Sequence, residues 1–295
     1  MPYRTLVILG LASFISILTV SASPKQQDDY VSNIEAWRLE REHNLKADDG
    51  WLTVAGLFFL REGDNTFGSS PLNDIVLPEG PAEAGVFELQ NQKVTLQAAV
   101  RKTLTVDGAQ VTSTTLYPSE ERVNITIGDL TLFVHHSGSR LAIRMRNTNS
   151  AIRQAFTGLQ WYPVKETYRV PARFIPHDKP ITVTVQNILG DIETLTSYGS
   201  VKLTLNGESL EMLPVDSDGQ LWFIFRDLTS GTETYGAARF LYADAPENGW
   251  TTVDFNKAYN PPCAFNPHTT CPLPPIQNRL QLRIEAGERN YKKRP

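Results

Sequence analysis

The chain has 295 residues, a formal net charge of −4, 20% charged and 41% hydrophobic residues. This mild acidity, without a basic stripe, argues against nucleic acid as a partner. The chain shows no P-loop, no dinucleotide fingerprint, no H-E-x-x-H and no G-x-S-x-G elbow, so the sequence predicts no cofactor and leaves any catalytic residue unknown.

Residues 1–22 have the layout of a secretory signal peptide. Arg4 precedes an apolar stretch from Leu6 to Val20, and small residues follow up to Ala22. An uncleaved membrane anchor is the alternative, but the apolar stretch is short for a spanning helix. No later stretch is apolar enough to span a bilayer. We therefore expect an exported protein, periplasmic or secreted, without an integral membrane segment after cleavage. The sequence does not indicate its oligomeric state.

Residues 23–149 are predicted to form a helix followed by a β-sandwich. Apolar residues recur at helical spacing between Tyr30 and Leu45. Short strands then alternate with turn residues, as in "GVFELQ", "KVTLQAAV" and "RLAIRMRN". "VDG" (106–108) and Gly128-Asp129 are typical of hairpin turns. The order of "FGSSPLNDIVLP" and "LTVDGAQV" loosely resembles a forkhead-associated sandwich. Ser69 stands where those domains carry an arginine for phosphopeptide, so that activity is not implied.

Residues 150–295 are predicted to form a second β-rich half, sandwich-like or barrel-like, packed on the first. The connecting segment 150–176 is rich in aromatic residues and prolines, so we expect it to pack between the halves rather than to act as a hinge. Alternation marks strands around 181–185 and 201–205, and "LNGE" is a hairpin turn. "TTVDFN" (251–256) and "NRLQLRIEAGE" (278–288) are also predicted as strands with a polar face.

Three stretches carry a resemblance to a family. They are "DGWLTVAGLFFLREGDNTFGS", "FIFRDLTSGTETYGAARFL" and "DFNKAYNPPCAFNPHTTCPLPPIQNRLQLRIEAGERNY". Together they resemble the DUF1684 family of bacterial and archaeal proteins, over nearly all of the chain from about Trp37 to Tyr291. The family is defined by sequence, so the resemblance implies no activity, cofactor or site.

Both cysteines lie in "DFNKAYNPPCAFNPHTTCPLPP" (254–275). Export favours a disulfide between Cys263 and Cys271, which would stabilise this proline-rich loop. A zinc site with His268 and an outside carboxylate is the second alternative, although the spacing is not that of a standard zinc knuckle. A cysteine nucleophile with His268 as its base is the third, and it leaves the second cysteine unexplained.

Eight residues in and around this segment are candidates for a ligand-binding site or a polar network: Arg239, Asp254, Asn256, Tyr259, Asn260, His268, Asn278 and Glu285. Arg239 lies on an otherwise apolar strand, so it pairs with a buried acid, with Asp254 or Glu285 as candidates, or faces an anionic ligand. The asparagines either bind a ligand or satisfy the backbone of an irregular loop.

Two classes of function follow from these residues. The first is a non-enzymatic exported protein that binds a small molecule or an envelope component through the polar residues of the C-terminal motif. The second is a hydrolase or metal-assisted enzyme that uses the same Asp, Asn, His and Arg side chains. The lack of a recognisable nucleophile–base pair favours binding.

Overall fold

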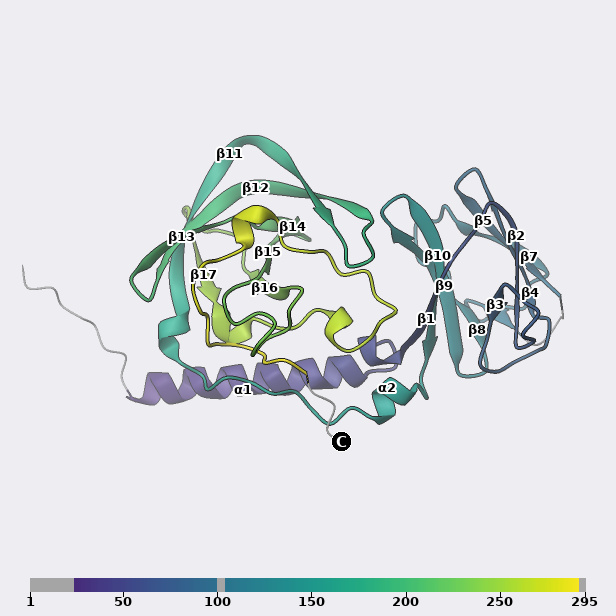
Figure 1. Ribbon diagram of the computed structural model, residues 1–295, viewed down its shortest axis with the longest axis horizontal. Helices are drawn as coiled ribbons and strands as arrows, with labels where there is room; N and C mark the ends of the chain where they lie inside the picture. The colour runs from purple at the N-terminus through teal and green to yellow at the C-terminus, as the bar shows by residue number, and fades with distance from the viewer. Residues whose placement is uncertain (1–23, 100–103, 292–295) are drawn as a thin grey trace, which may run out of the picture.

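The computed structural model describes residues 24–99 and 104–291, and the predicted signal peptide lies outside them. The fold is mainly β, with one long helix at its start, as predicted. Figure 1 shows two β-rich parts side by side, with the helix running beneath the C-terminal one. No helix within the described residues is long and apolar enough to cross a membrane.

Helix α1 (Pro24–Lys46) contains the predicted Tyr30–Leu45 segment and begins six residues earlier. Proline is tolerated in the first turn of a helix, because the backbone N–H that it lacks would have no partner there. Ile34 and Leu45 are buried, so one face of the helix packs on the molecule. A short 3₁₀ helix (Trp51–Thr53) then leads into the first strand.

The N-terminal part is a sandwich of two five-stranded sheets. The first sheet has the order β1-β10-β9-β8-β6 and the second the order β3-β2-β4-β5-β7. The strands of the first are β1 (Val54–Phe59), β6 (Thr105–Val106), β8 (Ile125–Ile127), β9 (Leu130–Ser137) and β10 (Arg140–Asn147). Those of the second are β2 (Gly63–Gly68), β3 (Ile75–Val76), β4 (Gly85–Gln90), β5 (Lys93–Ala98) and β7 (Ser113–Tyr117).

Period-two alternation places the apolar side chains of both sheets in one core between them. The rings of Phe67 and Phe87 stack there with centroids 4.1 Å apart. The predicted hairpin turns are confirmed: Asp107 and Gly108 both have positive φ, and β8 and β9 are joined at Gly128-Asp129. Two such residues in succession suit the type I′ turns that match the twist of paired strands.

The C-terminal half has two open sheets rather than a closed barrel. The first has the order β13-β12-β11-β17 and the second the order β14-β15-β16. Their strands are β11 (Arg169–Gln186), β12 (Ile192–Leu205), β13 (Glu208–Met212), β17 (Trp250–Asp254), β14 (Val215–Ser217), β15 (Gln220–Phe225) and β16 (Arg239–Ala243). The predicted "LNGE" turn joins β12 to β13 through Asn206 and Gly207, both with positive φ.

The prediction of a strand over 278–288 is wrong. This segment is irregular, and its pairing just beyond β15 is limited to an isolated bridge. Arg226 donates to the Asn278 carbonyl and accepts from the Leu280 N–H, and the Leu228 N–H donates to the Leu282 carbonyl. Gly287 has φ +79°, and a Cβ there would lie 2.3 Å from the Ala258 carbonyl oxygen. The close approach of two backbones takes the place of strand pairing. Likewise, "TTVDFN" is a strand only to Asp254, and a 3₁₀ helix (Phe255–Lys257) follows.

Further short helices mark the loops of the C-terminal half. They are α2 (Ala151–Gln154) and the 3₁₀ helices Glu166–Tyr168, Pro262–Ala264 and Ile276–Asn278.

The segment after α2 is ordered, but it runs along α1 rather than between the halves (Figure 1). The rings of Trp37 and Trp161 meet edge to face at 5.6 Å, and Arg38 donates to the Tyr162 carbonyl at 3.0 Å. The aromatic residues of the connection thus fix the helix.

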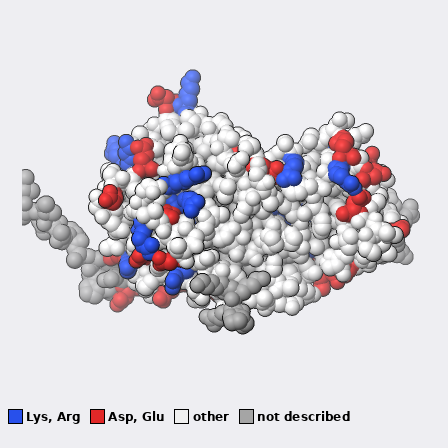
Figure 2. All heavy atoms as spheres, in the orientation of Figure 1, with Lys and Arg blue, Asp and Glu red and all other residues white. Residues whose placement is uncertain are grey.

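Polar contacts also join the two β-rich parts. Arg140, at the start of β10, binds both carboxylate oxygens of Asp191 at 2.7 Å, and Ser137 donates to the same carboxylate at 2.6 Å. Bidentate pairing of this kind fixes orientation as well as distance. On the face in Figure 2 the charged side chains form small groups of mixed sign, separated by wide uncharged areas.

Candidate functional site

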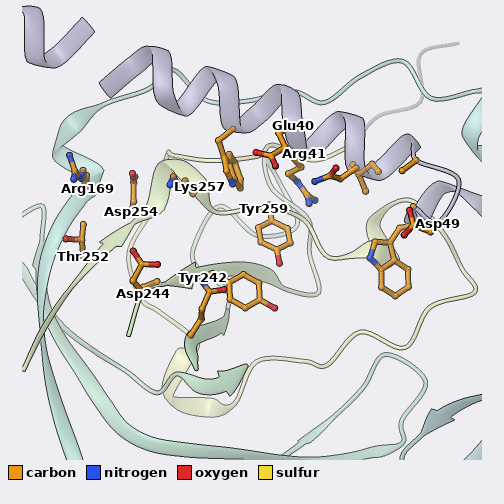
Figure 3. A pocket seen from close by; sticks show the side chains of 18 residues that line it. Glu40, Arg41, Asp49, Arg169, Tyr242, Asp244, Thr252, Asp254, Lys257 and Tyr259 are labelled. Atoms are coloured by element: carbon orange, nitrogen blue, oxygen red, sulfur yellow. The ribbon is translucent and has the colours of Figure 1, made fainter. Parts of the chain in front are cut away.

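A cleft of about 750 Å³ lies between α1 and the C-terminal half (Figure 3). We call it the main cleft. Its lining from α1 and the following turn is Trp37, Glu40, Arg41, Asn44, Leu45, Ala47, Asp49, Gly50 and Trp51. From the C-terminal half it is Arg169, Gln220, Tyr242, Ala243, Asp244, Thr252, Asp254, Lys257 and Tyr259.

Aromatic rings form the floor of the main cleft. Tyr242, on β16, and Tyr259 stack with centroids 6.4 Å apart, and Figure 3 shows both rings projecting toward the centre. Trp222 also stacks on Tyr242, with ring centroids 6.0 Å apart. The guanidinium of Arg41 lies 4.1 Å from the Tyr259 ring centroid. Rings of this kind offer flat apolar area with polar tips, which suits an organic ligand.

Arg41 is neutralised by a buried acid. Its Nε lies 2.8 Å from Glu288 Oε2, and its Nη2 donates to the Asn260 carbonyl at 2.8 Å. Glu288 is completely buried, and this burial raises the pKa of its carboxyl group while Arg41 opposes the rise. The pair therefore attaches α1 to the C-terminal segment, and Arg41 itself adds little net charge to the cleft.

Asp254 lies at the opposite end of the main cleft in a network of hydrogen bonds. The Tyr30 hydroxyl donates to its two carboxylate oxygens at 3.0 and 2.9 Å. Asn256 donates to Asp254 from its backbone and side chain, both at 3.1 Å, and to the Lys165 carbonyl at 2.9 Å. Burial is the main cause that raises the pKa of Tyr30, and the negative charge of Asp254 adds to the rise. These bonds attach the start of α1 to β17.

A second cavity of about 340 Å³, the inner pocket, adjoins the main cleft and shares Arg41, Leu45, Trp51, Tyr242 and Tyr259 with it. The rest of its lining is His135, Arg144, Trp222, Phe240, Pro262, Thr269, Thr270, Cys271 and Pro272. It therefore lies where the outer face of β9 and β10 meets the cysteine-containing loop.

Two strand residues of the sandwich form one wall of the inner pocket. Arg144 Nη2 donates to His135 Nε2 at 2.9 Å, and Thr270 Oγ1 lies 2.9 Å from the same nitrogen. Burial, together with Arg144, lowers the pKa of His135 to about 3, so the ring is neutral and accepts at Nε2. Burial lowers the pKa of Arg144 to about 10, which leaves it charged at neutral pH.

Of the eight residues predicted from the sequence, Asp254 and Tyr259 line the main cleft, and Tyr259 also lines the inner pocket. Arg239 is completely buried, as expected of a paired arginine, but its partner was wrongly predicted. It pairs with Asp227 at 3.5 Å and donates to the carbonyls of Ile284 and Ala286. The irregular course of 278–288 brings those carbonyls to Arg239.

Most of the remaining candidates bond to backbone groups or lie in surface ion pairs. Asn260 donates to Glu288 and to the Arg289 carbonyl, both at 2.8 Å. The Asn278 side chain accepts from the Leu213 N–H and donates to the carbonyls of Leu213 and Ile224, so it joins these two backbone segments. Glu285 pairs with Arg283 at the surface. His268 donates through its backbone to Asn266, and burial lowers the pKa of its ring. The bonds of the two asparagines match the alternative in which their side chains satisfy the backbone of an irregular loop.

Both cysteines are free thiols, so the structure does not show the predicted disulfide. The Cys263 N–H donates to Cys271 Sγ at 3.2 Å, which keeps the two residues side by side. The hydrogen bond with the Cys263 side chain lowers the pKa of the Cys271 thiol, and burial opposes this shift without cancelling it. Within residues 24–99 and 104–291 no group of three or more His, Cys, Asp and Glu is placed to hold a metal ion, so the zinc alternative gains no support.

Sequence reasoning missed Arg41, His135, Arg144 and Tyr242. Arg144 belongs to the alternating stretch "RLAIRMRN", in which Leu141, Ile143 and Met145 face the sandwich core. An arginine on the opposite face is normally solvated. The only available signal was the number of arginines on that face, and it did not predict burial.

Comparisons with known proteins support a family but no activity. Residues 154–289 match the family model described as "Protein of unknown function (DUF1684)". An uncharacterized protein of Haloarcula marismortui, solved by solution NMR, is 31% identical, over 46% of this chain and 78% of that one, with a TM-score of 0.40. None of the curated proteins matches this chain.

Proposed function

The chain belongs to the DUF1684 family of proteins of unknown function, and we propose that this member is an exported protein that binds a small organic molecule in the main cleft. One observation carries the proposal. The cleft combines a floor of aromatic rings with charged side chains around it, in a volume of about 750 Å³, which is within the range of small-molecule sites.

The charged residues of the cleft support binding through hydrogen bonds at defined points. Arg41 and Asp254 are held by partners from other elements, so their positions are set before a ligand arrives. Such preorganisation lowers the entropic cost of binding. Export is supported by the sequence of residues 1–22, which lie outside the described residues.

The enzymatic alternative would require the polar residues of the C-terminal motif to meet at one cavity. Arg239, Asn256, Asn260 and Glu285 line neither the main cleft nor the inner pocket, and Asp254 lines only the former. No observation favours a hydrolase over a binding protein, so binding is the function we propose.

A thermal-shift screen of small organic molecules is expected to give compounds that stabilise the protein and whose effect is lost in Tyr242→Ala. Tyr242 is 36% exposed and lines both cavities, so its removal takes away ligand contact at little cost to the fold. A ligand that binds only the folded state stabilises it by RT ln(1 + [L]/Kd), where [L] is the free ligand concentration. This amounts to about 2.7 kcal/mol when [L] is 100 times Kd.

Tyr198→Ala is the matched control, because Tyr198 is 51% exposed on β12 and lines neither cavity. Compounds that bind the main cleft should stabilise this variant as much as the unmodified protein. The proposal fails if no compound stabilises the protein, or if every stabilising compound acts equally on Tyr242→Ala and Tyr198→Ala.

We also propose that Cys263 and Cys271 form a disulfide once the protein has been exported to an oxidising compartment. The Cys263 N–H donates to Cys271 Sγ at 3.2 Å, so the two residues lie side by side in the folded chain. Protein isolated from such a compartment should show no free thiol by alkylation and mass spectrometry, and two after reduction. Two alkylated cysteines without prior reduction would contradict this prediction.

A further inference from the structure

The main cleft is lined by charged side chains of both signs, whereas the inner pocket is lined by positively charged ones without an Asp or Glu. Its lining contains two arginines, Arg41 and Arg144, and no Asp or Glu. Arg41 is neutralised by Glu288. Arg144 is therefore the source of an uncompensated positive charge at this cavity.

Arg144 is 5% exposed, and none of the ion pairs among the described residues includes it. Its Nη2 contacts only the neutral His135 ring at 2.9 Å and the Thr270 hydroxyl at 3.5 Å. Its Nε is buried without a hydrogen-bond partner in the structure. A buried guanidinium is costly unless an anion accompanies it, so this arrangement points to an anion that comes from outside the chain.

The rest of the inner pocket indicates what the anion is attached to. Trp51, Trp222, Phe240, Tyr242 and Tyr259 surround the cavity, and the Trp222 indole N–H is a second buried donor without a partner. The Arg144 guanidinium also lies 5.5 Å from the Trp51 ring centroid. At about 340 Å³ the pocket is far larger than an inorganic ion, and its aromatic walls favour a flat apolar group.

Among the described residues that line this pocket, the Cys271 thiol is the one group besides the tyrosine phenols that can become an anion by losing a proton. As a thiolate it could serve as the counter-ion of Arg144 in the reduced protein. It cannot do so once it is part of a disulfide, and Cys271→Ser removes it as well. Removal of a thiolate that competes for Arg144 should tighten the binding of an external anion, whereas removal of a neutral thiol should leave that binding unchanged.

We propose that the inner pocket binds an organic anion with an aromatic or other flat apolar group, and that Arg144 is the residue that recognises its negative charge. The assignment rests on the proposed function, because it names the ligand class of the same connected site. The anionic group would occupy the position beside Arg144 and the Trp222 N–H, and the apolar part would extend along Tyr242 and Tyr259 toward the main cleft.

The test uses three probes of nearly the same shape and different charge: indole-3-acetate, the neutral indole-3-acetamide and the cationic tryptamine. Their binding to the full-length exported protein is measured by isothermal titration. We expect indole-3-acetate to bind in the millimolar range or tighter, and indole-3-acetamide to bind about 10- to 100-fold more weakly, because a charged hydrogen bond is lost. Tryptamine should show no binding.

Arg144→Met should weaken binding of indole-3-acetate by about 10- to 100-fold and leave indole-3-acetamide unaffected. Arg144→Lys, which keeps the charge without the planar fork, should lie between the two. Arg146→Met is the matched control, because Arg146 follows on the same face of β10 and lines neither cavity. Cys271→Ser should bind indole-3-acetate at least as tightly as the unmodified protein.

Equal affinity for the acetate and the amide overturns the inference, as does an equal effect of Arg144→Met and Arg146→Met, loss of binding in Cys271→Ser, or absence of binding by all three probes. These results leave the proposed function testable on its own. Compounds that stabilise the protein through Tyr242 regardless of their charge would retain the binding function and remove only the anion assignment.

Discussion

Arg41→Met is expected to lower the free energy of unfolding by about 3–5 kcal/mol, because it leaves the carboxylate of Glu288 buried without a cation. Glu288 is completely buried, and its remaining donors are the backbone and side-chain N–H groups of Asn260. The change also removes the bond from α1 to the Asn260 carbonyl. Urea unfolding followed by tryptophan fluorescence and circular dichroism measures the loss.

The loss caused by Arg41→Met should depend on pH. Burial already raises the pKa of the Glu288 carboxyl in the folded protein, and removal of Arg41 takes away the charge that opposes this rise. A carboxyl whose folded pKa lies above its unfolded pKa loses stability as the pH rises from the unfolded to the folded value. The deficit of the variant relative to the unmodified protein should therefore be larger at about pH 8 than at about pH 5.

Arg169→Met is the control for Arg41→Met, since Arg169 also lines the main cleft but is exposed. Its effect should stay within about 0.5 kcal/mol. Adding Glu288→Gln to Arg41→Met removes the unpaired charge and should restore part of the stability. An Arg41→Met variant as stable as Arg169→Met, or one whose deficit grows as the pH falls, would contradict this account of α1 attachment.

Arg239→Met is the second change expected to have a large effect, also about 3–5 kcal/mol. It leaves Asp227 as a buried carboxylate without a cation, and it removes the donors to the carbonyls of Ile284 and Ala286. Asp227 keeps bonds from Thr229 at 2.7 Å and from the Ile284 N–H at 2.6 Å, but neither carries a charge. The midpoint and slope of urea unfolding give the change in stability.

Arg283→Met is the matched control for Arg239→Met. Arg283 pairs with Glu233 and Glu285, but its side chain is 45% exposed, so water replaces the lost partners. Exposed pairs of this kind contribute about 0–1 kcal/mol. The assignment of Arg239 to a structural role would be wrong if Arg239→Met unfolded no more easily than Arg283→Met.

Local patterns predicted much of the fold. Helical spacing placed a helix over Tyr30–Leu45, and positive-φ turn residues at Asp107-Gly108 and Asn206-Gly207 placed two hairpins. These features depend on neighbours in sequence, since capping, periodicity and turn geometry act over a few residues. The sandwich and the family membership followed from the same kind of pattern, repeated over long stretches.

The strand predicted over 278–288 failed because alternation alone does not supply a partner strand. It makes two backbone hydrogen bonds to Arg226 and one to Leu228, and Gly287 lies in close contact with Ala258. Arg239 shows the same limit on a smaller scale. Its position on an apolar strand correctly indicated burial, whereas its partner Asp227 was decided by which loop reached it.

The candidate site depends on contacts between distant segments. Alternation along β9 and β10 assigns His135 and Arg144 to the outer face of the sandwich, but it cannot tell whether water or protein covers that face. The loop that carries Thr270 and Cys271, more than 120 residues later in the chain, covers it in the folded protein. A pattern of side chains therefore established which face these residues occupy, and long-range packing determined that they are buried beside a cavity.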